Sequence, residues 1–120
     1  IVPQRSDVPL VAWASRHLYE KLLRHGVRIY ERRDRMLHSK LMVVDGRWSV
    51  VGSCNFDPRS LLLNLELFAI VRSTALAAAL GSFCRFERRR SRPVRIGHVR
   101  RRSWWSKLLQ RTAWAFKRWL

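Results

Sequence analysis

Apolar residues along the chain recur with two different periods. Helical spacing covers residues 10–25 and 75–88, whereas shorter apolar runs of strand length occupy residues 27–30, 48–51 and 67–71. The run at 67–71 is continuously apolar, which is typical of a buried strand. Because strands alternate with helices, the pattern predicts an α/β fold in which helices flank a mixed sheet.

A further strand carries ionisable residues. His38 and Lys40 are followed by four apolar residues, 41–44, and then by an Asp45-Gly46 pair that predicts a hairpin turn into the strand at 48–51. Alternate residues of a strand share a face, so His38 and Lys40 project to the same side. This spacing suits one phosphate, because the imidazole can attack phosphorus or move a proton while the ammonium holds an oxygen.

The return strand ends in residues with further polar groups. Gly52 allows a close backbone approach to a ligand, and Ser53 and Asn55 add hydroxyl and amide donors for the same phosphate. Glu66 opens the strand at 67–71 and needs a partner, since an unpaired buried carboxylate is costly. His38 is the first candidate for that partner, and Arg59 is the alternative.

The spacing H-x-K-x4-D-x6-G-S-x-N, from His38 to Asn55, resembles the signature of the phospholipase D superfamily. Residues 55–60 and 64–66 are similar to the bacterial cardiolipin synthase branch, and nearly the whole chain resembles the C-terminal part of a B-type enzyme with the second motif. The resemblance implies a catalytic set, a substrate-binding pair and no metal or cofactor. The catalytic set is His38, Lys40, Asp45, Asn55 and Glu66, and the substrate-binding pair is Gly52 and Ser53.

Within that set, two residues have more particular roles. The resemblance implies that Glu66 hydrogen-bonds the motif histidine, and the position of Asp45 at a strand end favours structural or electrostatic support over proton transfer. The implied activity transfers a phosphatidyl group between two phosphatidylglycerol molecules through a phosphohistidine. Phospholipid hydrolysis, nucleic-acid phosphodiester cleavage and an inactive membrane or scaffold protein are the alternatives.

Members of the superfamily combine two such motifs in one active site, and this sequence holds one. The chain also opens on Ile1 rather than Met, so we expect it to be part of a longer protein. The other motif would then come from a missing N-terminal half or from a second chain, and this part alone would be inactive.

Positive charge is concentrated late in the chain. Lys and Arg outnumber Asp and Glu by 12 to 7 through residue 84 and by 13 to 1 after it, within a formal net charge of +17. Residues 88–102 contain eight arginines, one Pro and one Gly, a composition that predicts a linker. We therefore expect a catalytic half-domain at 1–87, a linker at 88–102 and a separate helix at 103–120.

The helix at 103–120 combines four tryptophans with a basic face. Its expected apolar side comprises Trp105, Leu108, Leu109, Thr112, Phe116, Trp119 and Leu120, and its expected outer side comprises Lys107, Gln110, Arg111 and Arg118. This composition is typical of a helix that lies in the plane of an anionic bilayer. The alternative is that the helix docks on the missing half of the protein. With the resemblance, the composition predicts peripheral attachment to the cytoplasmic side of a bacterial inner membrane.

Overall fold

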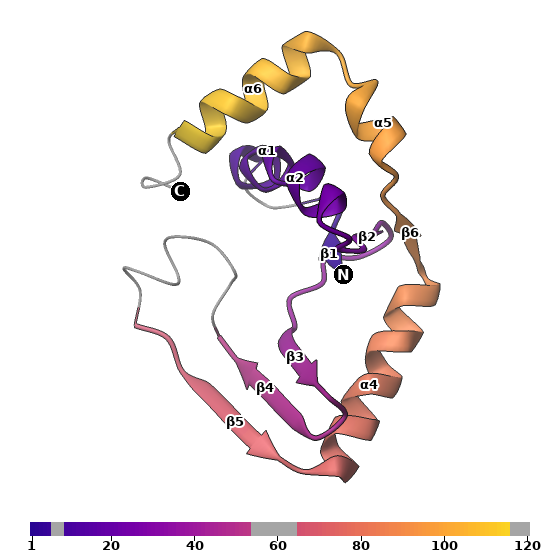
Figure 1. The fold of residues 1–120 in the computed structure, drawn as a ribbon. Coiled ribbons are helices and arrows are strands. Elements are labelled where there is room, and N and C mark those ends of the chain that lie inside the picture. The colour runs from indigo at the N-terminus through magenta and orange to yellow at the C-terminus, as the bar shows by residue number, and fades with distance from the viewer. Residues whose placement is uncertain (6–8, 54–64, 116–120) are drawn as a thin grey trace. The chain divides into compact units, whose positions relative to one another are not determined.

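The computed structural model describes residues 1–5, 9–53 and 65–115 of the chain. The chain divides into two compact units (Figure 1). The first, here called the split unit, joins residues 1–37 to residues 91–120, and the second, the hairpin unit, comprises residues 38–90. Each unit has its own three-stranded sheet, so the α/β class is confirmed while the strands form two sheets instead of the expected single one.

The sheet of the split unit is mixed. Strand β2 (Tyr30–Arg32) lies between β1 (Val2–Pro3), which is parallel to it, and β6 (Ser91–Pro93), which is antiparallel. The expected strand at 27–30 was placed too early, because pairing with β6 extends through Arg32. Arg32 is buried and forms an ion pair with Asp34, at 2.7 Å between Nη1 and Oδ1.

Two helices occupy the region where one was expected. Helix α1 (Pro9–His17) and helix α2 (Tyr19–Arg24) meet at Leu18, whose N–H donates to Ser15 O over three residues instead of four. This tighter turn changes the helical phase. Tyr19 is therefore buried, while Trp13 and Leu22, which helical spacing places on the apolar side of a single helix over residues 10–25, are exposed. Gly26, with φ of +81°, follows the C-cap of α2 at the expected position.

The prediction of a linker at 88–102 was wrong. This segment contains β6 and helix α5 (Ile96–Arg100), and Val99 is buried with Tyr19 and Ile29 in the core of the split unit. A few apolar residues among the arginines are sufficient to hold this segment against the core. Val94 also packs there, and its N–H donates to Ile29 O at 2.9 Å.

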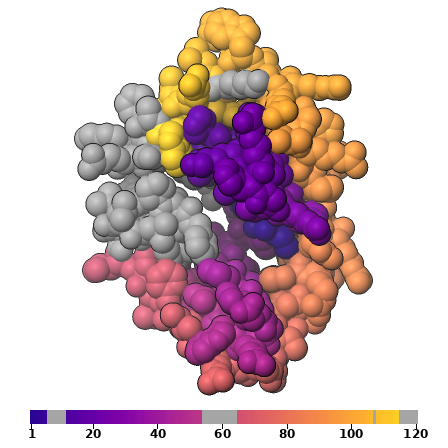
Figure 2. Space-filling model, in the orientation of Figure 1, coloured from indigo at the N-terminus to yellow at the C-terminus, as the bar shows by residue number. Residues whose placement is uncertain are grey.

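The last helix, α6 (Trp104–Ala115), also belongs to the split unit. It packs along α1, and α5 packs against α2, so atoms of the late helices lie against atoms of the early ones (Figure 2). Gln110 and Ala113 are buried on the side facing α1, although Gln110 was expected to face outward. Trp104, Trp105, Leu108 and Leu109 are exposed.

The hairpin unit contains an antiparallel sheet and one helix. Strand β4 (Trp48–Gly52) lies between β3 (Lys40–Val44) and β5 (Phe68–Arg72), and helix α4 (Thr74–Arg89) packs on β3 and β4. The sequence offers Ser73 or Thr74 as the cap of α4, and in the structure the Ser73 hydroxyl accepts from the Leu76 N–H at 3.2 Å. On α4, Ala77 is buried and Ala79 is exposed.

The prediction that β5 is a buried strand was wrong within this chain. All five of its residues are exposed, and Ile70 retains 67% of its accessible surface. Helix α4 contacts β3 and β4 but not β5, which therefore forms an edge of the sheet. Met42 and Val44 of β3, expected in a buried strand, are also exposed.

No helix within the described ranges is long and apolar enough to cross a membrane.

Candidate active site

A tight turn sets the geometry of the candidate site. Asp45 and Gly46 have φ angles of 51° and 62°, and the Arg47 N–H donates to Val44 O at 3.1 Å. Two successive positive φ angles define the turn type whose twist matches that of a hairpin, and Asp-Gly adopts it readily. The turn fixes the register of the two strands, which places Lys40 opposite Gly52 at the other end of the hairpin.

His38 and Lys40 lie together at that open end. Lys40 Nζ is 2.9 Å from both ring nitrogens of His38, so the ammonium donates to whichever nitrogen carries no proton. His38 is exposed and precedes the first residue of β3 by two positions, while Lys40 is partly buried. The structure thus brings these two side chains to the same side, as the alternation of a strand predicts.

Ser53 connects the end of β4 to the residues before β5. Its hydroxyl donates to Glu66 Oε2 at 2.5 Å and accepts from the Leu67 N–H at 3.2 Å. The Ser53 N–H also donates to Leu67 O at 3.1 Å. These three bonds place a carboxylate beside the strand end that carries Gly52, which is the end where Lys40 lies.

Gly52 is required by the packing of the backbone. A Cβ at this position would lie 2.3 Å from the carbonyl oxygen of Leu67 and 3.0 Å from the Phe68 ring. The sequence suggested that glycine permits a ligand to approach, and the structure shows that it permits the chain entering β5 to approach. Gly52 therefore helps to bring Glu66 close to Ser53.

Two predicted site residues are not part of this cluster. Asp45 lies in the hairpin turn, five residues after Lys40, which corresponds to about 16 Å along a strand. The structure therefore does not bring Asp45 together with His38 and Lys40. Asn55 lies outside the described residues, as does Arg59, the alternative partner for Glu66.

The cluster offers groups suited to phosphoryl chemistry. The imidazole can act as a nucleophile or exchange a proton, the ammonium can balance the charge on phosphate oxygens, and the carboxylate can orient a hydrogen-bonding neighbour. The contact predicted between Glu66 and His38 stays a prediction, and Ser53 is the described partner of Glu66. Among the described residues, no three His, Cys, Asp or Glu side chains gather in a way that could hold a metal ion.

The Ser53–Glu66 hydrogen bond is the feature of this site that sequence reasoning missed. Ser53 was assigned to phosphate and Glu66 to histidine, whereas the structure joins them to each other. The signal that could have found the bond is the register of β4 with β5, in which Gly52 pairs with Phe68. That register places Ser53 opposite Leu67, next to Glu66, but the separation of 13 residues along the chain conceals it.

A histidine and a lysine lie side by side at the start of a hairpin strand, with a carboxylate near the end of its partner strand, and these are groups that phosphoryl-transfer chemistry uses. A family described as "Cardiolipin synthase, PLD-like domain" matches residues 1–87, a range that contains this whole site. The chain belongs to this family.

Curated relatives agree with that assignment. Cardiolipin synthase A of Pectobacterium carotovorum is 36% identical over 116 residues, which cover 97% of this chain and 24% of the relative. Cardiolipin synthase A of Salmonella arizonae is 43% identical over 82 residues, which cover 68% of this chain and 17% of the relative. The chain thus spans about a quarter or less of the length of these relatives. No solved structure matches the chain significantly.

Proposed function

We propose that the protein containing this chain is a cardiolipin synthase, which transfers a phosphatidyl group from one phosphatidylglycerol to another. In this proposal the chain supplies one of two H-x-K motifs in a shared active site. The observation that carries the proposal is the 2.9 Å contact between His38 and Lys40, within the range that matches the family. The curated relatives named cardiolipin synthase A give further support.

The proposed reaction has two steps and uses two histidines, one from each motif. The first histidine is the nucleophile that bonds to phosphorus, and the second gives and takes the proton. In the first step, a ring nitrogen attacks the phosphodiester, the bond to one glycerol oxygen breaks, and the second histidine gives that oxygen its proton. In the second, the same histidine takes the proton of an incoming glycerol hydroxyl, whose oxygen attacks phosphorus and releases the first histidine. The products are cardiolipin and glycerol.

The remaining residues support these steps. Lys40 neutralises charge on the phosphate oxygens, together with the predicted donor Asn55. Glu66 keeps its predicted role of orienting His38, and its bond to Ser53 would hold the carboxylate in place for that purpose. Gly52 and Ser53 shape the pocket for the substrate phosphate. Asp45 supports catalysis only indirectly, through the turn that sets the hairpin register.

The test is lipid mass spectrometry on the full-length protein with phosphatidylglycerol vesicles. Wild type should form cardiolipin and glycerol, His38→Ala should lose at least about 99% of this activity, and His98→Ala should retain it. His98 is a suitable control because it is an exposed histidine of the split unit. Phosphatidic acid in place of cardiolipin would show a hydrolase, and cleavage of DNA or RNA without any lipid product would show a nucleic-acid phosphodiesterase.

The nucleophile can be identified separately. His38 could be the nucleophile or the acid and base, and its place in the second motif favours the second role by resemblance. Rapid quenching in neutral detergent, which preserves the acid-labile phosphorus–nitrogen bond of a phosphohistidine, should therefore trap a labelled phosphoenzyme in His38→Ala when the lipid carries labelled phosphorus. Absence of label in that variant, with label in wild type, would instead make His38 the nucleophile.

The type of synthase and the source of the other motif are finer parts of this proposal. The B-type assignment rests on the resemblance, and the relatives above carry the A-type name. Assays of the full-length protein beside purified A-type and B-type enzymes, with matched donor lipids, would distinguish the two. Light scattering during activity would show whether the second motif comes from the same chain or from a second copy.

We also propose that α6 contacts an anionic membrane. Its exposed side carries two stacked tryptophans, Trp104 and Trp105, with 63% and 61% of their surface accessible, followed by Leu108 and Leu109. Tryptophan and leucine beside many arginines suit the boundary between headgroups and acyl chains. Replacing both tryptophans by serine should reduce sedimentation with phosphatidylglycerol vesicles, whereas Trp13→Ser on α1 should not. Carbonate extraction and protease accessibility would test peripheral attachment on the cytoplasmic side.

A further inference from the structure

The split unit contains a pocket that the proposed reaction does not use. Its volume is about 280 Å³, and four helices contribute to its wall. The lining residues are Arg16 and His17 of α1, Glu20 of α2, Val99 of α5, and Gln110 and Arg111 of α6. Because early and late residues of the chain line it together, the pocket exists only when the split unit has formed.

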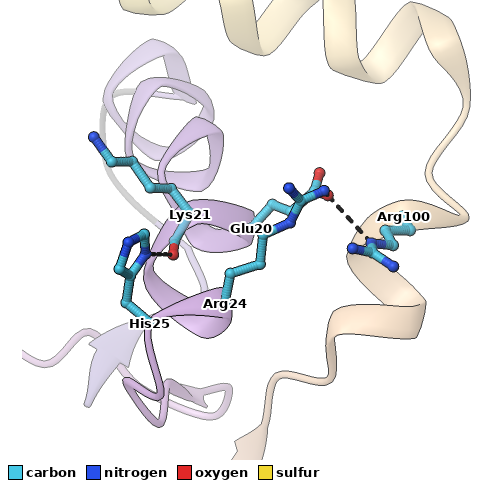
Figure 3. A network of polar contacts seen from close by, with 5 residues as sticks. All are labelled: Glu20, Lys21, Arg24, His25 and Arg100. Atoms are coloured by element: carbon cyan, nitrogen blue, oxygen red, sulfur yellow. Dashed lines mark hydrogen bonds and ion pairs between the residues drawn. The ribbon is translucent and has the colours of Figure 1, made fainter.

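One carboxylate of the wall is already neutralised by arginines. Glu20 Oε1 accepts from Arg24 Nη2 at 2.6 Å and lies 3.2 Å from Arg100 Nε, which joins α2 to α5 (Figure 3). These two hydrogen bonds lower the pKa of Glu20. The Glu20 carboxylate is therefore charged at neutral pH and is engaged by two guanidinium groups.

Arg16 and Arg102 share one nearby carboxylate, that of Glu31. Arg16 donates to Gln4 O at 2.6 Å, and its Nε lies 3.5 Å from Glu31 Oε1. Arg102 Nη1 and Glu31 Oε1 are both buried without a hydrogen-bond partner among the described residues, and the Arg102 guanidinium lies 5.8 Å from the centre of the Tyr19 ring. Burial, followed by the nearby charge of Arg16, lowers the pKa of Arg102. Two guanidinium groups therefore lie near one carboxylate, and Arg111 adds a third on the pocket wall.

The charges around the pocket leave a clear excess. Among the described residues that line the pocket, Arg16 and Arg111 carry guanidinium groups and Glu20 carries the one carboxylate, which Arg24 and Arg100 already engage. Gln110 adds a buried amide, which donates to Ser106 Oγ at 3.0 Å. An anion with several oxygens would supply acceptors for the two guanidinium groups of the lining, and guanidinium groups match phosphate oxygens in particular.

We propose that this pocket binds a phosphate group carried by a small ester of about the size of glycerol phosphate. The volume of about 280 Å³ lies just below the usual range for drug-sized ligands, about 300–1,000 Å³, and excludes a whole phospholipid. The phosphate can belong to a soluble ester or to a membrane lipid whose headgroup alone enters. A lipid source would rest on the proposed membrane contact of α6, whereas a soluble source would not.

The experiment measures binding to the full-length protein by titration calorimetry, with inorganic phosphate and glycerol 3-phosphate as probes. Arg111→Gln should weaken binding to the pocket about tenfold, since a hydrogen bond to a charged group is lost. Arg92→Gln, on an exposed arginine of β6 outside the lining, is the matched control and should leave binding unchanged. The measured quantity is the difference between these variants, because the hairpin site can also bind phosphate.

Three further arms complete the test. Arg16→Lys, which keeps the charge but not the planar fork, should also weaken binding while circular dichroism shows that the fold persists. If Arg111 affects binding only with phosphatidylglycerol vesicles and not with phosphatidylcholine vesicles, the source is a lipid headgroup. His38→Ala should retain the Arg111-dependent binding even though it loses turnover, which separates this site from the proposed function. Equal losses in Arg111→Gln and Arg92→Gln, or no saturable binding, would overturn the proposal.

Discussion

The two units of the chain differ in how far they bury their apolar side chains. The split unit collects Tyr19, Ile29 and Val99 into a buried core, with residues supplied from both of its segments. The hairpin unit leaves the whole of β5 exposed, including Ile70, although the sequence there is typical of a buried strand. The split unit therefore contains partners for its core, whereas the apolar pattern of β5 indicates a partner that the described residues do not provide. The missing half with the first motif is our proposed partner.

The largest expected loss of stability comes from a substitution in the core of the split unit, which should leave the hairpin unit intact. Val99→Asp would place an unpaired charge beside Tyr19 and Ile29 and should lower the free energy of unfolding by at least about 3 kcal/mol. Hydrogen exchange should become faster in α1 and α2, while β3 and β4 keep their protection. Val27→Asp, at an exposed position, is the control. Equal loss of protection in both units would contradict their independence.

A second change weakens the hairpin unit. Gly52→Ala would force a Cβ against the Leu67 carbonyl and should cost about 1–3 kcal/mol, with faster exchange along β5. Gly81→Ala is the matched control, because its nearest contact is the end of the Arg85 side chain at 3.4 Å and alanine favours a helix. If Gly52→Ala were as stable as wild type, the close approach of β5 would not govern this strand pair.

A third change separates the turn from the chemistry. Gly46→Ala should destabilise the hairpin by about 1–2 kcal/mol, since alanine is disfavoured at a φ of 62°. Asp45→Asn should preserve both stability and lipid transfer, because asparagine also accepts this backbone conformation. Thermal unfolding and the cardiolipin assay measure the two properties. A large loss of activity in a stable Asp45→Asn protein would restore a direct catalytic role for Asp45.

The smallest expected effect concerns pH. Hydrogen bonds from Arg24 and Arg100 lower the pKa of Glu20 below its ordinary value of 4.5, so the folded state favours the charged carboxylate. The resulting stability is present above the ordinary pKa and is lost as the pH falls through the lowered value. The protection factors of the α5 amides, which are corrected for the pH dependence of intrinsic exchange, should therefore fall in acid, and Glu20→Gln should show this lower protection already at neutral pH. Lys21→Gln, next to it in α2, should behave as wild type.

The sequence predicted those parts of the structure whose determinants are local. Asp45-Gly46 specifies the hairpin turn, the Ser73-Thr74 pair marks the start of α4, and the alternation of a strand places His38 beside Lys40. None of these features requires a contact with a distant part of the chain. They are correct because the turn, the cap and the pleat each follow from a few neighbouring residues.

The missed parts depend on distant contacts. Val99 is buried because Tyr19 and Ile29 lie beside it, and no pattern within the arginine-rich segment announces partners about 70 residues earlier. The Ser53–Glu66 bond likewise depends on the register between β4 and β5. For β5 the sequence predicts more burial than the structure shows. Residues 67–71 form an apolar run typical of a buried strand, yet all five residues of β5 are exposed.

The two segments of the split unit are synthesised at different times. Residues 38–90 must be made between its two segments, which takes roughly 3–10 seconds at bacterial rates of elongation. During that interval Tyr19 and Ile29 have no Val99 to cover them, whereas the hairpin can close as soon as Gly52 is available to pair with Lys40. The apolar side chains of Tyr19 and Ile29 therefore have to wait for the second segment of their own unit, whereas every strand of the hairpin unit is made in one continuous stretch.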